Sequence, residues 1–229
     1  MTYLGSKRKY SKYIVPIIQK TIDENKINTF IDCCCGGCNI IKNIKCKKRI
    51  AIDKDKYLIA LWKKLQEKNF SFPPTPTRKD WDNAKKGLGE DWYIGLVKVF
   101  CSSYARGFGG GFDTRDRTYS GRCNTCKKDL PLISDIDFIA ADYSTLLNYS
   151  NCVIYIDPPY QNTRKYDVSK DFDYNDFWNT VREISKNNIV FVSEQVAPED
   201  FEAIWTLKTE RLINGKHYDC VENLYVLKK

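Results

Sequence analysis

Short apolar runs alternate with amphipathic runs along most of the chain. The first kind is typical of buried strands and the second of helices that cover a sheet. Strands are predicted at residues 28–33, 49–53, 137–143, 152–157 and 188–194. Helices are predicted from residue 39, at residues 56–68 with Leu58, Leu61, Trp62 and Leu65 on one face, and at residues 174–188. This alternation predicts an α/β fold, with a mostly parallel sheet covered by helices on both faces.

The rhythm breaks between residues 70 and 135. This segment begins with a proline-rich entry, can form one helix at residues 91–105, and continues through a Gly-, Arg- and aromatic-rich run without a clear period. It is therefore predicted to be a small, largely helical or loop-like insertion at residues 70–135. The main α/β domain would then comprise residues 1–69 and 136–229, closed at one sheet edge by a hairpin of residues 204–213 and 221–229.

Four acidic residues close predicted strands, namely Asp32, Asp53, Asp142 and Asp157. A single aspartate at a strand end is commonly a cap of a turn or helix. In an open parallel sheet, however, ligands bind beyond the carboxyl ends of the strands. Four such acids in one chain therefore favour a ligand site along that rim.

The spacing of the first two acids indicates what kind of ligand this is. Asp53 ends the second strand about 20 residues after Asp32, the place of an acid that binds ribose hydroxyls in nucleotide sites. The intervening "CCCGGC" lacks the spaced glycines that let a pyrophosphate approach a helix. A cofactor with an adenosine and an amino-acid tail, but no diphosphate, fits this pattern.

Five short motifs, in this order, resemble those of Dam-type adenine-specific DNA methyltransferases. They are "YLGSK", "FIDCCCGGCN", "AIDKD", "ADY" and "DPPY" at residues 157–160. The order places cofactor motifs first, the target-recognition insertion next and the catalytic motif last. The resemblance implies a Rossmann-like methyltransferase sheet, S-adenosylmethionine as cofactor and double-stranded DNA as partner. The three cysteines 33–35 depart from the usual Pro-Phe and small residues of the family.

The resemblance also implies roles for individual residues. Lys7 would face the cofactor carboxylate, Asp53 would hold the ribose, and Asp142 and Tyr143 would flank the adenine. Gly36 would pass close to the methionine part. The full set of cofactor residues implied in this way is Tyr3, Gly5, Lys7, Asp32, Cys33, Gly36, Asp53, Asp142, Tyr143 and Asp157.

The "DPPY" segment suits methyl transfer to an amino group. An adenine amine is a poor nucleophile, because its lone pair is delocalised into the ring. Acceptors aimed at its two N–H groups would counter this, and Asp157 and the carbonyl of Pro158 are the predicted pair. Pro158 and Pro159 stiffen the chain and add no backbone donor. Tyr160 would stack on the adenine once it is flipped out of the duplex.

Charge supports a nucleic-acid partner. The chain carries a formal charge of +8, and residues 101–131 contain six basic but three acidic residues. Lys and Arg on phosphates release counterions, and aromatic rings can enter a groove. The DNA-binding residues predicted in the insertion are Arg106, Phe108, Arg115, Arg117, Arg122 and Lys127. Which of them reads a base edge is left open, as is the target sequence.

The ten cysteines and the lack of an apolar leader predict a cytoplasmic protein with reduced thiols, located on DNA. Cys123 and Cys126 lack a second ligand pair, so no metal is expected. No membrane span is predicted, and the protein is expected to be a monomer or weak dimer. Two alternatives stay open: an amino-methyltransferase acting on RNA, and a catalytically inactive DNA-binding module. The biological role, in restriction-modification, phage self-protection or regulation, is not determined by the residues.

Overall fold

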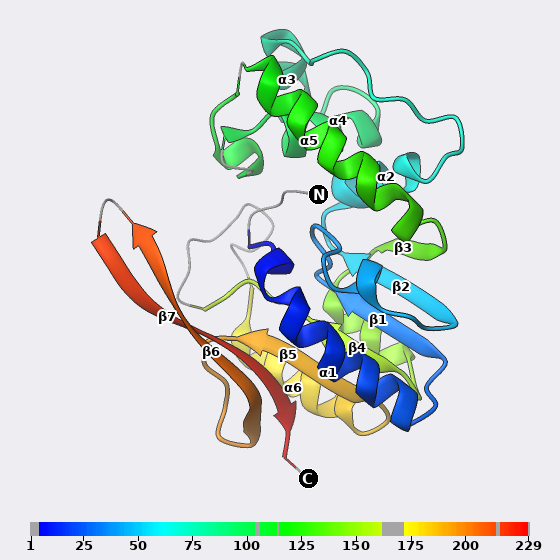
Figure 1. Cartoon of the computed structure of the whole chain (residues 1–229), viewed down its shortest axis with the longest axis vertical. Helices are drawn as coiled ribbons and strands as arrows, with labels where there is room; N and C mark the ends of the chain where they lie inside the picture. The colour runs from blue at the N-terminus through cyan, green and yellow to red at the C-terminus, as the bar shows by residue number, and fades with distance from the viewer. Residues whose placement is uncertain (1–4, 104–105, 114, 162–171, 214–215, 229) are drawn as a thin grey trace.

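The fold is built on one twisted seven-stranded sheet with the strand order β3-β2-β1-β4-β5-β7-β6 (Figure 1). A computed structural model of the chain describes residues 5–103, 106–113, 115–161, 172–213 and 216–228. The strands are β1 (Thr29–Cys33), β2 (Lys48–Asp53), β3 (Ile136–Ala140), β4 (Val153–Ile156), β5 (Ile189–Glu194), β6 (Phe201–Ile213) and β7 (Lys216–Leu227). The first five pair in parallel, and β7 joins antiparallel to β5 and β6. The α/β, mostly parallel, Rossmann-like fold class predicted from the sequence is confirmed.

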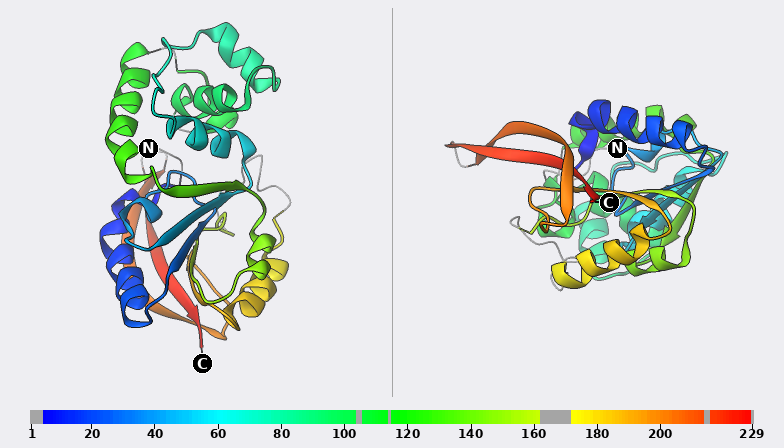
Figure 2. Two further views of the ribbon diagram at one scale, coloured as in Figure 1. Left: turned by 90° about the vertical axis from the view of Figure 1, so that its right-hand side faces the viewer. Right: turned by 90° about the horizontal axis from the view of Figure 1, so that it is seen from below.

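Helices cover both faces of this sheet, as the alternation predicted (Figure 2). The α-helices are α1 (Ser11–Glu24), α2 (Lys56–Leu65), α3 (Arg78–Lys85), α4 (Asp91–Phe100), α5 (Asp116–Asp129) and α6 (Tyr174–Ser185). Short 3-10 helices are η1 (Lys7–Lys9), η2 (Ile41–Asn43), η4 (Gly107–Gly109), η5 (Leu130–Leu132) and η6 (Tyr143–Asn148). Helices α1 and α2 pack on one face around Phe30 and Ala51. Helix α6 packs on the other face around Ile31 and Ile154.

The helix predictions need correction, and helices α1 and α3 were not predicted. The segment from Asn39 forms only the three-residue η2, which ends where the backbone becomes extended at Ile44. In the insertion, the run that showed no period contains the 14-residue helix α5. Its buried positions are Tyr119, Cys123, Cys126 and Asp129, which lie on one helical face but include no large aliphatic side chain to mark an apolar stripe.

The described part of residues 70–135, the predicted insertion, packs closely on α2 and lies in the upper lobe of Figure 1. A Cβ atom on Gly95 of α4 would lie 2.1 Å from the Tyr57 carbonyl oxygen of α2. Only glycine therefore lets the two helices approach this far. The buried Asp55, which caps α2, also forms a 2.6 Å ion pair with Lys98 of α4. Asp55 lies two residues after Asp53, so this contact joins the insertion to the end of β2.

Candidate active site

The candidate site lies where the strand order reverses, between β1 and β4. The chain runs from β1 outward to β2 on one side, while β4 pairs with β1 on the other. The Asp157 backbone N–H donates to the Cys33 carbonyl at 3.1 Å, which closes the two strand ends together. Because side chains alternate along a strand, Asp32 and Asp53 lie on the face of Phe30 and Ala51. Open α/β sheets bind ligands at such a reversal of strand order, beyond the carboxyl ends of the strands.

Asp157 forms an ion pair with Lys7 across the site. The Lys7 ammonium lies 2.6 Å from Asp157 Oδ1, and both side chains are largely buried. Burial raises the pKa of Asp157 to about 6, although Lys7 opposes this shift. The sequence placed Lys7 at the cofactor carboxylate, and in the structure it lies on the catalytic acid predicted from "DPPY". Its contact with the cofactor stays a prediction.

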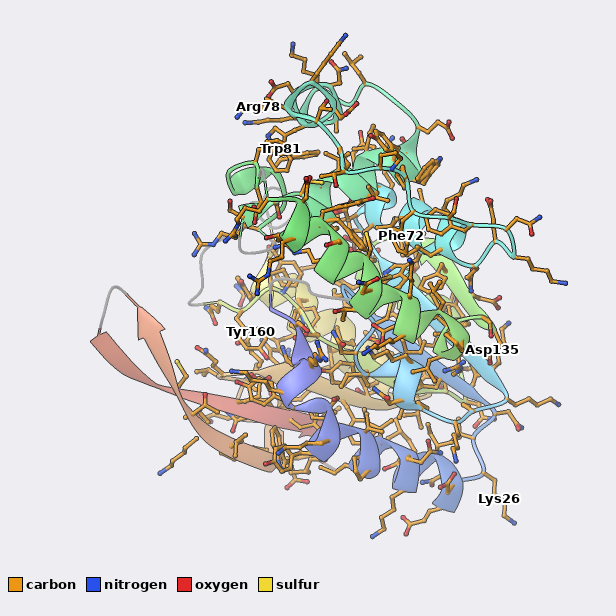
Figure 3. All side chains as sticks on the ribbon, turned by 45° about the horizontal axis from the view of Figure 1, so that its top comes forward. Lys26, Phe72, Arg78, Trp81, Asp135 and Tyr160 are labelled. Atoms are coloured by element: carbon orange, nitrogen blue, oxygen red, sulfur yellow. The ribbon has the colours of Figure 1, made fainter. Side chains whose placement is uncertain are left out.

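The residues after Asp157 are held from other elements. Pro158 is buried, and the Tyr174 hydroxyl donates to the Pro159 carbonyl at 2.9 Å. Tyr160 is buried, with 8% of its surface exposed, and its hydroxyl donates to Glu222 of β7. The Lys7 ammonium lies 4.6 Å from the centre of the Tyr160 ring. Figure 3 labels Tyr160 where the N-terminal segment meets this loop.

Glu222 is a site residue that the sequence analysis missed. Its side chain is 2% exposed and lies 3.6 Å from the Lys7 ammonium. A usable signal was present, because Glu222 shares its strand face with Leu224, which is fully buried. A carboxylate at an inward-facing strand position is costly unless it has a partner, and so marks a site.

Asp32 and Asp53 both brace the loop that follows β1. Asp53 accepts hydrogen bonds of 3.0 Å from the backbone N–H groups of Gly36 and Asp55, and burial raises its pKa to about 6. Asp32 accepts from the Ile41 N–H at 3.2 Å, and burial raises the pKa of this carboxyl well above its usual range. Gly36 adopts a φ of 45°, and its carbonyl accepts from the Trp62 indole at 3.0 Å.

The other predicted cofactor residues do not all lie around this loop, because the Tyr143 ring packs against Phe177 of α6 on the other face of the sheet. Ala141 donates to the Asp53 carbonyl, which brings Asp142 beside the end of β2. Asp142 caps η6 through the Ser144 N–H, and the Tyr143 hydroxyl donates to Asp176 at 2.7 Å. Gly5 has a φ of 75°, and Cys33 is buried at the end of β1. Tyr3 lies outside the described residues.

The site fits a positively charged ligand with a hydrogen-bond donor. Asn39 is buried and donates to the Ser6 hydroxyl at 2.8 Å, which joins the "YLGSK" segment to the cofactor loop. Among the described residues, its side-chain oxygen has no hydrogen-bond partner. Among the described residues, the site also holds five carboxyl groups that are buried or half-buried, and Lys7 forms ion pairs with two of them, Asp157 and Glu222. The five are Asp32, Asp53, Asp157, Glu194 and Glu222. S-adenosylmethionine, with a sulfonium and an ammonium group, fits both features.

The predicted DNA-binding residues of the insertion fall into two groups. Arg106, Arg115, Arg117 and Lys127 are exposed. Arg122 donates through one guanidinium nitrogen to the carbonyls of Val99, Phe100 and Ser102, and so caps α4. The Phe108 ring packs edge-on against Trp81, with 5.2 Å between ring centres. Phe108 and Arg122 thus take part in the packing of residues 70–135, and their contact with DNA stays a prediction.

Cys123 and Cys126 lie buried on the inner face of α5. Burial raises the pKa of the Cys126 thiol to about 12. Across the described ranges, no group of three or more His, Cys, Asp or Glu side chains could hold a metal ion. In the same ranges, the helices are too short or too polar to cross a membrane.

Comparison with known proteins gives one sequence match. Residues 3–93 match the family model of the D12 class N6 adenine-specific DNA methyltransferases. This is less than half of the chain, and the match ends before the segments that contain Asp142 and Asp157. No curated protein matches the sequence.

Solved structures with a similar course of the chain are distant in sequence. A proposed RNA methyltransferase from Pyrococcus horikoshii is 10% identical, with a TM-score of 0.40 over 93% of this chain and 81% of its own. Precorrin 8W decarboxylase from Methanobacterium thermoautotrophicum is 9% identical, with a TM-score of 0.37 over 92% and 89%. An S-adenosylmethionine-dependent methyltransferase from Clostridium acetobutylicum is 10% identical, with a TM-score of 0.35 over 98% and 75%. At this level the likeness says nothing about substrate.

The family match bears on reaction class and cofactor. It supports adenine methylation as the reaction and confirms S-adenosylmethionine as the cofactor predicted from the sequence.

Proposed function

We propose that the protein is a site-specific DNA methyltransferase, which transfers a methyl group from S-adenosylmethionine to the N6 amino group of a flipped-out adenine. One observation carries this proposal. Asp157, Pro158, Pro159 and Tyr160 leave β4 at the point where the strand order reverses, with the Asp157 carboxylate buried beside Lys7. A carboxylate in such a place can accept a hydrogen bond from an amine and stabilise positive charge that builds up on it.

The geometry of the tetrapeptide supports a pair of acceptors. Asp157 would accept one N–H of the adenine amine, and the Pro158 carbonyl the other. The Pro159 carbonyl already accepts from Tyr174, which fixes the course of the chain after Pro158. Holding both N–H groups localises the lone pair on the amine nitrogen. When bound, the cofactor supplies an electrophilic methyl group on its sulfonium. The ring of Tyr160 would stack on the extruded base and offset part of the cost of unpairing it.

The cofactor would lie along the ends of β1, β2 and β3. In the proposal Asp53 holds the ribose and also keeps Gly36 in place. Asp142 and Tyr143 flank the adenine, and Gly5, Asp32 and Cys33 shape the surrounding loops. The Asn39 side-chain oxygen would accept from the cofactor's ammonium group, because it is a buried acceptor without a partner among the described residues. Tyr3 and Lys7 complete the set implied by the resemblance.

The insertion would bind double-stranded DNA. Its exposed basic residues Arg106, Arg115, Arg117 and Lys127 suit phosphate contacts, and the lobe lies beyond the sheet on the side of α2. Because Gly95 and Lys98 fix the insertion against α2, DNA held by this lobe has a defined position relative to Asp53 and the cofactor loop. Residues 70–135 would thus act as the target-recognition region.

A methylation assay tests the proposal. Purified protein is incubated with S-adenosylmethionine carrying a labelled methyl group, and with duplex DNA, single-stranded DNA or RNA in separate reactions. The nucleosides are then identified by mass spectrometry. We expect N6-methyladenine in duplex DNA, and a loss of at least about 100-fold in rate with Asp157→Asn. Asp137→Asn, an exposed aspartate on β3, is the matched control and should retain the rate.

Other outcomes separate the alternatives. Methyl transfer confined to RNA would replace DNA by RNA as the substrate. Cofactor and DNA binding without any methylated product would identify an inactive DNA-binding module. Methylation that survives Asp157→Asn would remove the assigned role of the tetrapeptide.

A further inference from the structure

A second buried carboxylate, Glu222, completes the cluster around Asp157. Glu222 is on β7, one residue before Asn223, which is the first β7 residue along the chain to pair with β5. Its Oε1 accepts the hydroxyl hydrogen of Tyr160 and lies 3.6 Å from the Lys7 ammonium. The Lys7 ammonium lies closer to Asp157, at 2.6 Å. Three segments far apart in sequence, namely η1, the loop after β4, and β7, therefore meet in one cluster.

The charges in this cluster do not balance. Glu222 is 2% exposed and Lys7 is 6% exposed, so little water screens either. Two carboxylates face one ammonium, which leaves a net negative charge where a cationic methyl group would move to an amine. Tyr160 needs only an acceptor for its hydroxyl, and a neutral amide would supply one. The charge of Glu222 therefore requires a reason beyond fixing the tyrosine, because a buried carboxylate is costly.

The position of Lys7 supplies that reason. In the described state Lys7 occupies one oxygen of Asp157, the group that would accept the amine. With the cofactor bound, Lys7 would also face its carboxylate. Within the protein, the ammonium needs a second partner in reach for Asp157 to bind the amine at full strength. Glu222 is such a partner, because a shift of about 1 Å would bring the ammonium from 3.6 Å to hydrogen-bond distance. No covalent bond changes in this exchange.

We propose that Glu222 is a positioning residue for methyl transfer, which orients the Tyr160 ring and takes over Lys7 from Asp157 when the target amine arrives. This inference rests on the proposed function, since it assumes that Asp157 accepts the amine. Glu222 need not touch substrate or cofactor; it acts through Tyr160 and Lys7.

The first test is Glu222→Gln, which keeps the side-chain size and an acceptor for Tyr160 but removes the charge. Asp157 would then be the one charged partner of Lys7 left in this cluster. We expect kcat to fall about 10- to 100-fold, with the Kd for S-adenosylmethionine changed less than about threefold. Glu222→Asp restores the charge and should recover part of kcat. The matched control is Glu202→Gln, an exposed carboxylate on the neighbouring strand β6, which should leave kcat unchanged.

The pH profile of kcat gives a readout that a merely structural role would not move. Glu222 raises the pKa of Asp157, so Glu222→Gln should shift the acid limb of the profile to lower pH. Among the described residues, the substitution leaves in place the other titratable groups that interact with Asp157, namely Lys7, Asp32, Cys34, Asp53, Tyr155, Tyr160 and Glu194. A double-mutant cycle with Lys7→Met completes the test. If Glu222 acts by receiving Lys7, the effects of the two substitutions should be far from additive.

The outcomes keep this inference separate from the proposed function. If the unaltered protein forms no N6-methyladenine, the proposed function fails. If it does, but Glu222→Gln retains full kcat with an unshifted pH profile, only the role of Glu222 is overturned. A loss of kcat that Glu222→Asp does not relieve, with additive effects in the cycle, would also overturn it. Thermal unfolding and cofactor binding of each variant report whether it is folded.

Discussion

At the scale of single residues, Asp157 should set the acid limb of the pH profile of kcat. Burial raises its pKa to about 6, so the carboxyl is protonated and a weaker acceptor below that pH. At saturating cofactor and DNA, log kcat should therefore rise up to about pH 6 and level off above it. Lys7→Met should move this limb to higher pH, because Lys7 lowers the pKa of Asp157. Steady-state rates between about pH 5 and pH 8 test both expectations, and a flat profile would contradict them.

Asn39 offers a residue-scale test of cofactor binding that does not depend on DNA. Its side-chain oxygen is the buried acceptor proposed for the cofactor ammonium. Asn39→Ala should weaken S-adenosylmethionine binding by roughly 10-fold, the effect of one hydrogen bond to a charged group. Isothermal titration measures this, with Asn43→Ala in η2 as a comparison variant that should bind within about twofold. An unchanged Kd for Asn39→Ala would place the ammonium elsewhere.

At the scale of elements, the contact between α2 and α4 depends on Gly95. A methyl group there would collide with the Tyr57 carbonyl of α2. Gly95→Ala should lower the free energy of unfolding by about 1–3 kcal/mol, because the two helices must move apart. Gly121→Ala is the matched control, since a Cβ at this exposed position of α5 meets nothing within 4 Å. It should be neutral or stabilising by up to about 1 kcal/mol. Chemical denaturation compares the two, and equal stabilities would refute the tight packing.

The elements also show how far sequence patterns lead. The strands and α2 followed from apolar periodicity, because their buried positions carry large apolar side chains such as Leu58, Leu61 and Trp62. Helix α5 was missed, because its inner face is made of Tyr119, Cys123 and Cys126. The strand-end acids were predictable as a rim, since parallel strands end at one edge. Glu222 was missed, although it alternates with the apolar Leu224, because it enters the site through the antiparallel β7, which is distant in sequence from every motif that marks the site.

The insertion also differs from what its composition predicted. Its composition suggested one surface of arginines and aromatic rings. In the structure, some of these side chains pack inside the insertion and others are exposed. Arg122 caps α4 and Phe108 covers Trp81, while Arg117 and Lys127 remain exposed. A loop-like sequence cannot show which side chains fold inward, because without a regular period there is no face to assign.

At the scale of the whole molecule, the +8 charge leads to a prediction about DNA binding. Binding through phosphates makes log K fall linearly with log salt concentration, with a slope of about −0.9 per phosphate contact. Arg117→Gln and Lys127→Gln, two exposed positions on α5, should each reduce this slope by about one unit. Lys26→Gln removes the same charge at the far end of α1, away from the insertion (Figure 3), and should leave the slope unchanged. Fluorescence anisotropy with labelled duplex DNA at several salt concentrations measures all four proteins. If Lys26→Gln reduces the slope as much as the two α5 variants do, binding follows the net charge of the molecule and not the insertion.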